Sequence, residues 1–374
     1  MNEKTFQTRI ERCTDMMKSE GCNALLLTKP SNMYYLTNDG RLCAYAMITQ
    51  DGKVAIGVPK TDIDDVKQCA YFDHIVGFED EVGMIHSIAH YFGRFGISKG
   101  TVGLEYTFLT QSMMGIVTHP HAKPKDVAPK DCTHIMSSLR VVKEDQEIDR
   151  LRQAAAVADI GMKAAIGAVK PGITESQIAA EAEYAMRYAG AEEFWRTYVS
   201  SGPRTGIAHG LPTNRKLETG DLVMIDIHPM VNGYSSDICR TVCVERPSTE
   251  QQLAYDLYLK AQQTSIAKVK AGIGMVELGD TMHGIMGNGG HGDHIFGPPI
   301  HGIGIDFEES PLPPGHAFFH GEKEPPPLPA NVVIAIGNCG LYTDGWGVRV
   351  EDTVVVGEEG PIVLTAFPYS LTTR

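Results

Sequence analysis

Short apolar runs separated by polar turns dominate the first third of the chain. NALLLT at 23–28 is one such run, and AMITQDGKVAIGV at 46–58 contains two that are joined by an Asp-Gly turn. HIVGF and VGLEY continue the pattern between helix-like segments. The alternation of strand-like and helix-like segments predicts an α/β domain over residues 1–135.

Helical periodicity becomes stronger from residue 136 onwards. A long helix is predicted with apolar residues on one face from Ile148, a second opens with capping-box spacing from Thr174 to Gln177, and a third begins after Pro247. Strand-like segments lie at 221–228, 234–244, 300–308, 331–337 and 347–356. Helices followed by antiparallel strands predict an α+β domain over residues 136–374, with the helices outside a curved sheet.

Composition narrows the class of protein. The chain has a formal charge of −13 and no run of Lys and Arg, so nucleic acid and anionic membranes are not expected partners. Its eight cysteines form no C-x-x-C pair, which is typical of reduced thiols. The polar N-terminus resembles no signal peptide, and no apolar run approaches the roughly 20 residues that cross a bilayer. We therefore expect a cytoplasmic protein.

The stretch MIDIHPMVNGYSSDICRT at 224–241 reads as a hairpin closed by an Asn-Gly turn. Counting outward from the turn, His228 faces Asp237 and Asp226 lies diagonal to Asp237, so the three side chains share one face. A longer turn would instead pair the two aspartates directly. Two carboxylates on a buried face need a cation, a shared proton or several donors. The alternative is that Asp237 pairs with Arg240 or caps a turn.

Three further segments supply candidate ligands and catalytic groups. HGIGIDFEESP contains His301 and Glu308, VRVEDTVVV places Arg349 and Glu351 on one face, and SSGPRTGIAHG contains His209. Aspartate, histidine and glutamate from separate strands form a hard oxygen and nitrogen ligand set. Such a set suits manganese, iron, cobalt or zinc.

The order of these segments resembles the pita-bread superfamily of creatinase, aminopeptidase P, prolidase and methionine aminopeptidase. The resemblance covers nearly the whole chain, through segments 25–37, 139–155, 220–242, 301–311 and 347–356. It implies a two-lobed catalytic domain behind a smaller N-terminal domain, and a homodimer. In metallopeptidase members two metal ions are held by five ligands, and four of these positions match Asp226, Asp237, His301 and Glu351.

The sequence departs from this family pattern at several positions. Gly337 takes the place of the fifth ligand, a glutamate, and Glu308 stands where many members carry a substrate-contacting histidine. His228 follows Asp226 by two positions, an arrangement similar to the extra ligand of dimethylsulfoniopropionate lyases. His228 can therefore replace the lost ligand, or it is a core histidine bonded to Asp237. The rearranged site would comprise Asp226, His228, Asp237, His301 and Glu351, with one ion favoured over two.

Resemblance to creatinase, which works without metal, suggests roles for two more residues. His209 matches the catalytic histidine of creatinase, and Arg349 matches an arginine that grips a substrate carboxylate. The two glutamates that creatinase uses against its guanidinium substrate fall on Cys239 and Gly337, so creatine is not the expected substrate. Metal-free operation is not excluded by the sequence.

The other candidate residues are predicted to have the following roles. His209 is predicted to transfer protons. Neighbouring residues on a strand point to opposite faces, so only one of Glu308 and Glu309 is predicted to face the cavity. Glu308 is the one predicted to do so. Cys239 is not expected to be a nucleophile, because nothing near it lowers its pKa. The histidines at 283, 291, 294, 316 and 320 and the proline-rich segment 311–330 are expected to be loop or lid residues.

These observations predict a hydrolase that cleaves a C–N bond in a small carboxylate-bearing substrate, either a dipeptide or an amide-like metabolite. The alternatives are an Xaa-Pro dipeptidase with an altered metal site, a metal-free creatinase-like hydrolase, a lyase resembling the dimethylsulfoniopropionate lyases, and a non-catalytic binding protein.

Overall fold

The computed structural model describes residues 3–312 and 326–373. The chain divides into two compact units, Met1–Arg140 and Val141–Arg374. The boundary predicted between residues 135 and 136 falls inside helix α6 (Thr133–Val141), which continues across it. Within the described ranges, no helix has both the length and the apolar character needed to cross a membrane.

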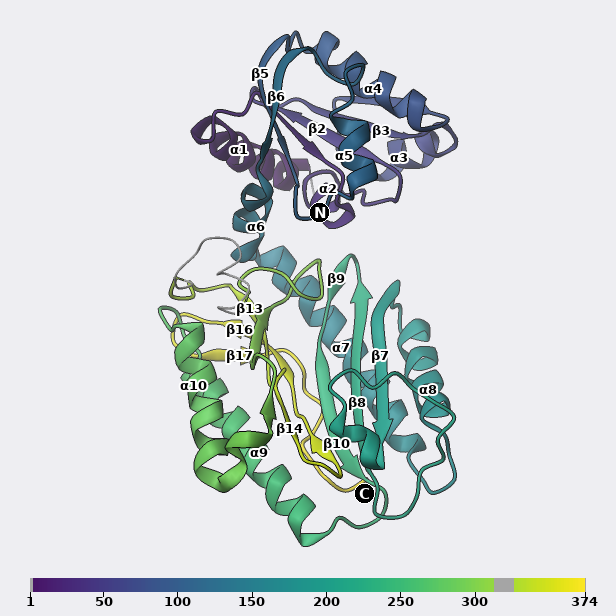
Figure 1. Ribbon diagram of the computed structural model, residues 1–374, viewed down its shortest axis with the longest axis vertical. Helices are drawn as coiled ribbons and strands as arrows, with labels where there is room; N and C mark the ends of the chain where they lie inside the picture. The colour runs from purple at the N-terminus through teal and green to yellow at the C-terminus, as the bar shows by residue number, and fades with distance from the viewer. Residues whose placement is uncertain (1–2, 313–325, 374) are drawn as a thin grey trace. The chain divides into compact units, whose positions relative to one another are not determined.

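The first unit is a mixed α/β sheet domain (Figure 1). Its other helices are α1 (Glu3–Ser19), α2 (Pro30–Thr37), η1 (Lys60–Asp62), α3 (Ile63–Cys69), α4 (Glu81–Arg94) and α5 (Gln111–Val117). Its strands are β1 (Ala24–Leu27), β2 (Tyr45–Thr49), β3 (Val54–Pro59), β4 (His74–Phe78), β5 (Lys99–Leu104) and β6 (Asp126–Asp131). The strands form one sheet in the order β4-β3-β2-β1-β5-β6. Apolar residues of α4 and α5 pack with those of the sheet in one core.

The second unit carries the candidate chemistry. Its helices are α7 (Asp145–Ala168), α8 (Glu175–Tyr188), η2 (Gly202–Gly206), α9 (Thr249–Lys268), α10 (Met275–Met286), η3 (Gly287–His291) and η4 (Gly292–His294). Its first strands are β7 (Glu193–Ser201), β8 (Leu222–Val231), β9 (Tyr234–Ser235) and β10 (Ile238–Cys243). The later ones are β11 (Ile295–Phe296), β12 (Ile300–Gly302), β13 (Val333–Ile336), β14 (Gly340–Tyr342), β15 (Gly347–Val348), β16 (Asp352–Val356) and β17 (Pro361–Val363).

The predicted helix starts of this unit are confirmed. Thr174 caps α8 by accepting a hydrogen bond from the Gln177 backbone, and the Gln177 side chain in turn accepts one from the Thr174 backbone. Ser248 caps α9 in the same way with Gln251. Each capping box satisfies backbone N–H groups that would otherwise lack partners at the start of the helix.

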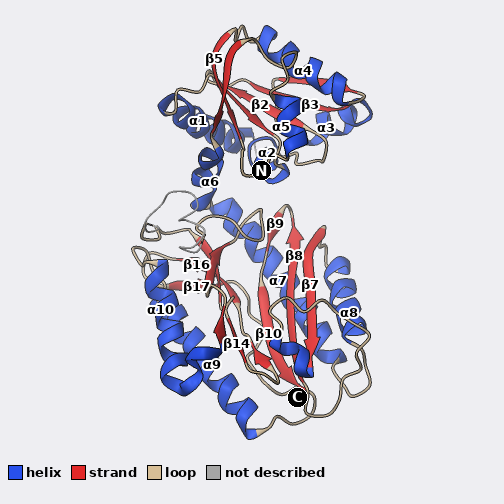
Figure 2. Ribbon diagram, in the orientation of Figure 1, coloured by secondary structure: helices blue, strands red, loops and turns tan. Residues whose placement is uncertain are grey.

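Two similar halves build the second unit, with strands between the helix pairs (Figure 2). In one half, α7 and α8 pack on the antiparallel sheet β10-β8-β7. In the other, α9 and α10 pack on the sheet β12-β13-β16-β17. A similar local sequence ends the first helix of each pair, at 169–173 and at 269–273, where Gly172 and Gly272 take φ of 86° and 90°. Only glycine adopts that conformation without strain.

The hairpin register follows the short turn. Residues 232–233 have φ of 50° and 75°, as a two-residue turn requires, and Val231 pairs with Tyr234. The strands beyond the turn place Asp226 opposite Cys239. The predicted shared face is therefore confirmed, and the alternative in which the two aspartates pair directly is wrong.

Three predicted strands differ from the structure. The segment 234–244 is divided into β9 and β10. The segment 300–308 forms a strand only at β12, because the chain turns back after Gly302 and bridges to Glu309. The segment 347–356 is divided into β15 and β16. Strand β7 was not predicted, although EFWRTYVSS is rich in the aromatic and β-branched residues typical of strands.

Candidate active site

Six polar side chains from four parts of the second unit meet in a buried cluster. Strand β8 carries Asp226 and His228, Asp237 lies between β9 and β10, and His301 lies on β12. Arg349 and Glu351 lie between β15 and β16, where Glu351 forms backbone hydrogen bonds with Cys239. All six are at most 2% exposed: Asp226, His228, Asp237, His301, Arg349 and Glu351. The structure thus brings together every residue that was predicted to bind metal.

Asp237 stands at the centre of the cluster, between the two histidines. Its Oδ1 lies 3.3 Å from His228 Nε2, and its Oδ2 lies 3.4 Å from His301 Nε2. His228 Nε2 is also 3.3 Å from Asp226 Oδ1, and His301 Nε2 is 3.7 Å from Glu351 Oε1. Two groups of potential ligand atoms therefore share Asp237, one with Asp226 and His228 and the other with His301 and Glu351.

Backbone carbonyls orient both histidines. The Nδ1 atom of His228 lies 2.8 Å from the Arg196 carbonyl oxygen, and that of His301 lies 3.1 Å from the Gly302 carbonyl oxygen. Because a carbonyl only accepts, each Nδ1 carries a proton, and whenever the ring is neutral its Nε2 lone pair faces the cluster. This is the arrangement that metal-binding histidines usually show. The residues present therefore fit a divalent cation.

Carboxylate charge in the cluster exceeds what its hydrogen bonds neutralise. Among the described residues, Asp226 Oδ1, Asp237 Oδ1 and both Glu351 carboxylate oxygens are buried without a hydrogen-bond partner. The Arg349 Nη2 contacts Asp226 Oδ2 closely, and its Nε lies 3.8 Å from Glu351 Oε2. One guanidinium faces three carboxylates, so a further cation or protons must complete the balance.

The excess of carboxylate charge shifts the pKa values of the cluster residues. Burial and the charge of Asp237 raise the pKa of Glu351 to about 8. Burial alone would lower the pKa values of His228 and His301, but the neighbouring Asp237 outweighs it and raises each to about 9. Burial opposes ionisation of Asp237, yet His228 and His301 hold its pKa below the usual range. Without metal, the cluster keeps protons that a cation would replace.

In protein stripped of metal with a chelator, we expect the melting temperature to fall as pH rises from about 6.5 to about 9. His228, His301 and Glu351 have higher pKa values in the folded than in the unfolded chain, so the stability they contribute is present at low pH and lost as pH rises through the folded values. Thermal unfolding followed by circular dichroism measures this. His228→Gln should flatten the dependence, and a melting temperature that rises across this window would contradict the assignment.

The backbone around Gly337 leaves no space for the side chain of the missing fifth ligand. It follows β13 and, in the register that pairs Ile336 with Asp352, lies opposite Glu351. Its φ is 117°, and a Cβ at this position would overlap the Val350 carbonyl oxygen and lie 2.9 Å from the Glu351 Cα. The space for a side chain is therefore absent, and not only the side chain itself.

His209 and Glu308 are exposed residues that are close enough to the cluster to affect its charges. Both side chains are exposed, and the His209 ring centroid lies 5.5 Å from that of Tyr198. Partial burial and then the charge of Arg349 lower the pKa of His209, while Glu308 opposes this shift. The charge of Glu308 also favours the protonated form of His301. Both predicted catalytic residues thus interact electrostatically with the cluster without belonging to it.

Glu309 serves a different purpose from its neighbour. Its Oε1 accepts a hydrogen bond from Lys143 at 2.9 Å, and both side chains are buried. Its Oε2 accepts from the Asp306 backbone at 3.1 Å. Glu309 therefore anchors the segment after β12. This division results from a turn and not from the strand alternation on which the prediction relied.

Aromatic residues around the histidines were missed by sequence reasoning. Phe307 has its ring centroid 4.8 Å from that of His228 and 5.6 Å from that of His301, in edge-type contacts with both. Trp195 of β7 stacks on Phe307 at 5.3 Å, and Tyr198 contacts His228. If β7 had been recognised as a strand beside the hairpin, the aromatic residues of EFWRTY would have predicted aromatic contacts to the histidines.

The other candidates play structural or peripheral parts. Cys239 is buried, and burial raises the pKa of its thiol well above the usual value, so it remains protonated. Arg240 binds Asp352 at 2.7 Å, so the alternative in which it pairs with Asp237 is wrong. His316, His320 and residues 313–325 of the proline-rich segment lie outside the described residues.

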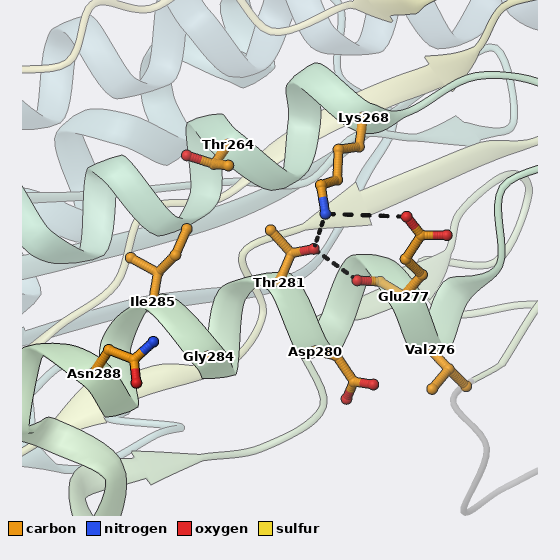
Figure 3. A pocket seen from close by; sticks show the side chains of 9 residues that line it. All are labelled: Thr264, Lys268, Val276, Glu277, Asp280, Thr281, Gly284, Ile285 and Asn288. Carbon is orange, nitrogen blue, oxygen red and sulfur yellow. Dashed lines mark hydrogen bonds and ion pairs between the residues drawn. The ribbon is translucent and has the colours of Figure 1, made fainter.

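A shallow hollow of about 680 Å³ lies elsewhere, against α9 and α10 (Figure 3). The Lys268 ammonium group at its edge already donates to Thr281 Oγ1 at 2.8 Å and lies 4.0 Å from Glu277. None of the predicted site residues lines this hollow. It is therefore separate from the candidate active site.

The chain is similar to known proteins over most of its length. Metallopeptidase family M24 matches residues 149–358, and the creatinase/prolidase N-terminal domain matches residues 9–142. The chain is 29% identical to an Xaa-Pro dipeptidase of Pyrococcus furiosus, over 96% of this chain and 98% of that protein.

Solved structures resemble the whole chain as well. The prolidase of Pyrococcus horikoshii has a TM-score of 0.85 at 26% identity, covering 97% of this chain and 99% of that one. An Xaa-Pro dipeptidase from Bacillus anthracis has a TM-score of 0.88 at 27% identity, covering 98% and 99%. These matches confirm the predicted α+β pita-bread fold and the predicted hydrolase of C–N bonds in the creatinase and aminopeptidase P superfamily.

Proposed function

The chain belongs to metallopeptidase family M24, and on that premise we propose that it is a dipeptidase that hydrolyses the peptide bond of a small substrate with a free carboxylate. The names of its relatives, which are Xaa-Pro dipeptidases and a prolidase, support a substrate with proline in the second position. The rearranged cluster is proposed to be the catalytic centre.

One observation carries this proposal. His228 and His301 direct their Nε2 atoms at the two oxygens of a single carboxylate, Asp237, while their Nδ1 atoms are held by backbone carbonyls. A core histidine would be satisfied by one hydrogen-bond partner at each ring nitrogen, but His301 Nε2 and Asp237 Oδ1 have none among the described residues. Two imidazoles arranged alike around one carboxylate are better explained by a shared cation site. His228 would then supply the donor that Gly337 lacks.

Each residue receives a role from its position. Asp226, His228, Asp237, His301 and Glu351 would hold the metal, with one ion favoured over two because Arg349 already neutralises part of the charge. When bound, a divalent ion supplies Lewis-acid activation of water for attack on a peptide carbonyl. Manganese, iron, cobalt and zinc all suit this ligand set.

Proton transfer and substrate binding would fall to residues at the edge of the cluster. His209 has a lowered pKa and is exposed, so it can accept a proton near neutral pH and return it to the leaving amine. Glu308 would assist from the same side. Arg349 contacts Asp226, and we propose that it positions this aspartate. Its Nε has no hydrogen bond among the described residues and lies 3.8 Å from Glu351 Oε2, and we propose that it also faces the substrate carboxylate.

Elemental analysis combined with isotope labelling tests this function. We expect stoichiometric metal in the wild-type protein, none in Asp237→Ala, and incorporation of one oxygen from labelled water into the product of Xaa-Pro hydrolysis. Hydrolysis by protein that stays metal-free would support the creatinase-like alternative, and an alkene product would support a lyase. If reconstitution with manganese, iron, cobalt and zinc yields neither bound metal nor turnover, the proposal is wrong and a binding protein remains.

Two further expectations accompany this function. A cytoplasmic location is expected from the scattered cysteines of the sequence. A homodimer is expected from the family resemblance. Cell fractionation and light scattering, respectively, would test them.

A further inference from the structure

Two buried cysteines of the first unit, 110 positions apart in sequence, lie side by side. The Sγ atoms of Cys22 and Cys132 are 3.2 Å apart, and neither residue is exposed to solvent. The sulfur atoms of a disulfide are about 2.05 Å apart, so a side-chain adjustment of about 1 Å would allow a bond. Cys22 lies two positions before β1, and Cys132 directly follows the end of β6.

Charged groups surround this pair. Lys130 Nζ lies 2.6 Å from Glu20 Oε2, and His134 Nε2 lies 3.0 Å from Glu20 Oε1. The hydrogen bond between the two thiols, against the effect of burial and together with the charge of Lys130, lowers the pKa of the Cys22 thiol to about 7. The pKa of Cys132 is raised by the same hydrogen bond and by burial. Either thiol can donate the hydrogen bond that joins them, so one cysteine of the pair can act as the nucleophile and the other as the proton donor.

A small oxidant can reach the pair by local opening. Strand β6 lies at the edge of the sheet and pairs with β5 alone. Most of its side chains are not buried. Cys132 is attached to the neighbouring strand by one backbone hydrogen bond, from its N–H to the Leu104 carbonyl at 2.9 Å. Edge segments with few buried contacts open more readily than the centre of a domain.

We propose that Cys22 and Cys132 form a reversible disulfide when the protein meets hydrogen peroxide. The Cys22 thiolate attacks one peroxide oxygen, the O–O bond breaks, and hydroxide leaves, so that Cys22 becomes a sulfenic acid. The Cys132 sulfur then attacks the Cys22 sulfur, the S–O bond breaks, and the hydroxyl group leaves as water with the thiol proton. Two thiols are oxidised by two electrons, and one peroxide is reduced to two waters.

The bond would join the segment before β1 to the residue that follows β6. It closes a loop that contains all six strands of the sheet, and restricting such a long loop in the unfolded chain stabilises the folded state. The site is distinct from the catalytic cluster, so the proposal stands independently of the peptidase function. A transient disulfide of this kind is also compatible with a reducing compartment.

The test uses the full chain with its two exposed cysteines replaced, as C43S/C69S, because Cys43 and Cys69 would otherwise react with peroxide. After treatment with peroxide and alkylation under denaturing conditions, we expect the loss of two titratable thiols and a cross-linked peptide containing Cys22 and Cys132 in mass spectra. Dithiothreitol should restore both thiols. The melting temperature of the first unit should rise by about 5 °C or more on oxidation.

Two further variants keep this test decisive. Adding Cys132→Ser should replace the disulfide with a sulfenic or over-oxidised Cys22, whereas adding Cys339→Ala, a buried cysteine of the other unit, should leave the cross-link unchanged. Near-ultraviolet circular dichroism before oxidation verifies that each variant is folded. Unchanged thiol content in folded protein, or a cross-link between other cysteines, would overturn the proposal.

Discussion

Replacing His228 with glutamine should remove bound metal from the protein and lower kcat/KM for Xaa-Pro dipeptides by at least about 100-fold. Glutamine has a similar reach and can still donate to the Arg196 carbonyl, but it presents no imidazole Nε2 to Asp226 and Asp237. If His228 replaces the ligand lost at Gly337, the remaining residues hold the ion too weakly to retain it. Equilibrium dialysis followed by elemental analysis measures this directly.

The same variant separates the two interpretations of His228. A core histidine would contribute to stability alone, so His228→Gln would lower the melting temperature and leave the metal content unchanged. His294→Gln, at an exposed position at the end of η4 in the same unit, is the matched control and should change neither quantity. Full metal occupancy in His228→Gln would show that the cluster does not depend on this side chain.

Restoring the family glutamate through Gly337→Glu should destabilise the protein and not rebuild a second metal site. The Cβ would overlap the Val350 carbonyl, and φ of 117° is unfavourable for any L side chain. Backbone strain and overpacking together are expected to cost about 3–5 kcal/mol. The new carboxylate would also face Glu351, whose oxygens already lack partners among the described residues. Thermal and denaturant unfolding measure the loss, which should lower the melting temperature by about 10 °C.

Two controls divide this effect into its causes. Gly337→Ala carries the clash and the strain without the charge. Gly220→Ala has a φ of 88°, also in the positive range, but open space around the added carbon, so it should cost only about 1–2 kcal/mol. If Gly337→Glu is as stable as the wild-type protein and gains a second ion, the backbone at this position relaxes freely and steric closure does not explain the lost ligand.

Much of the site was predictable because its parts repeat local patterns. An Asn-Gly turn and a period of two place Asp226, His228 and Asp237 on one face from the sequence alone, and the register confirms it. The same alternation separates Arg349 and Glu351 from Val348 and Val350, although the strand is broken there. The family resemblance supplied the link between these segments and His301, which no local pattern provides.

The errors lie where the chain turns or where distant segments meet. The segment after β12 was predicted to continue as a strand, but the ion pair of Glu309 with Lys143, 166 positions away, holds it in a turn. Strand β7 was overlooked, and with it the Arg196 carbonyl that orients His228 and the Trp195 ring that stacks on Phe307. Such contacts depend on the packing of separate elements, which periodicity does not describe.

The sequence by itself determined the local features of this protein. These are its two domains, the capped helices, the hairpin face with its two carboxylates, and a glycine instead of a glutamate at position 337. Those features follow from side-chain chemistry and from backbone periods within a few residues. Only the tertiary structure decided which contacts these residues make. In the folded protein a hydrogen bond to a neighbouring strand orients His228, and Arg349 forms an ion pair with Asp226. The Val350 carbonyl occupies the space that a side chain at position 337 would need. The contacts of His228 and of Gly337 each join neighbouring strands of one sheet, and the contact of Arg349 with Asp226 joins the two halves of the second unit. All three involve atoms from separate segments, which local periodicity does not place.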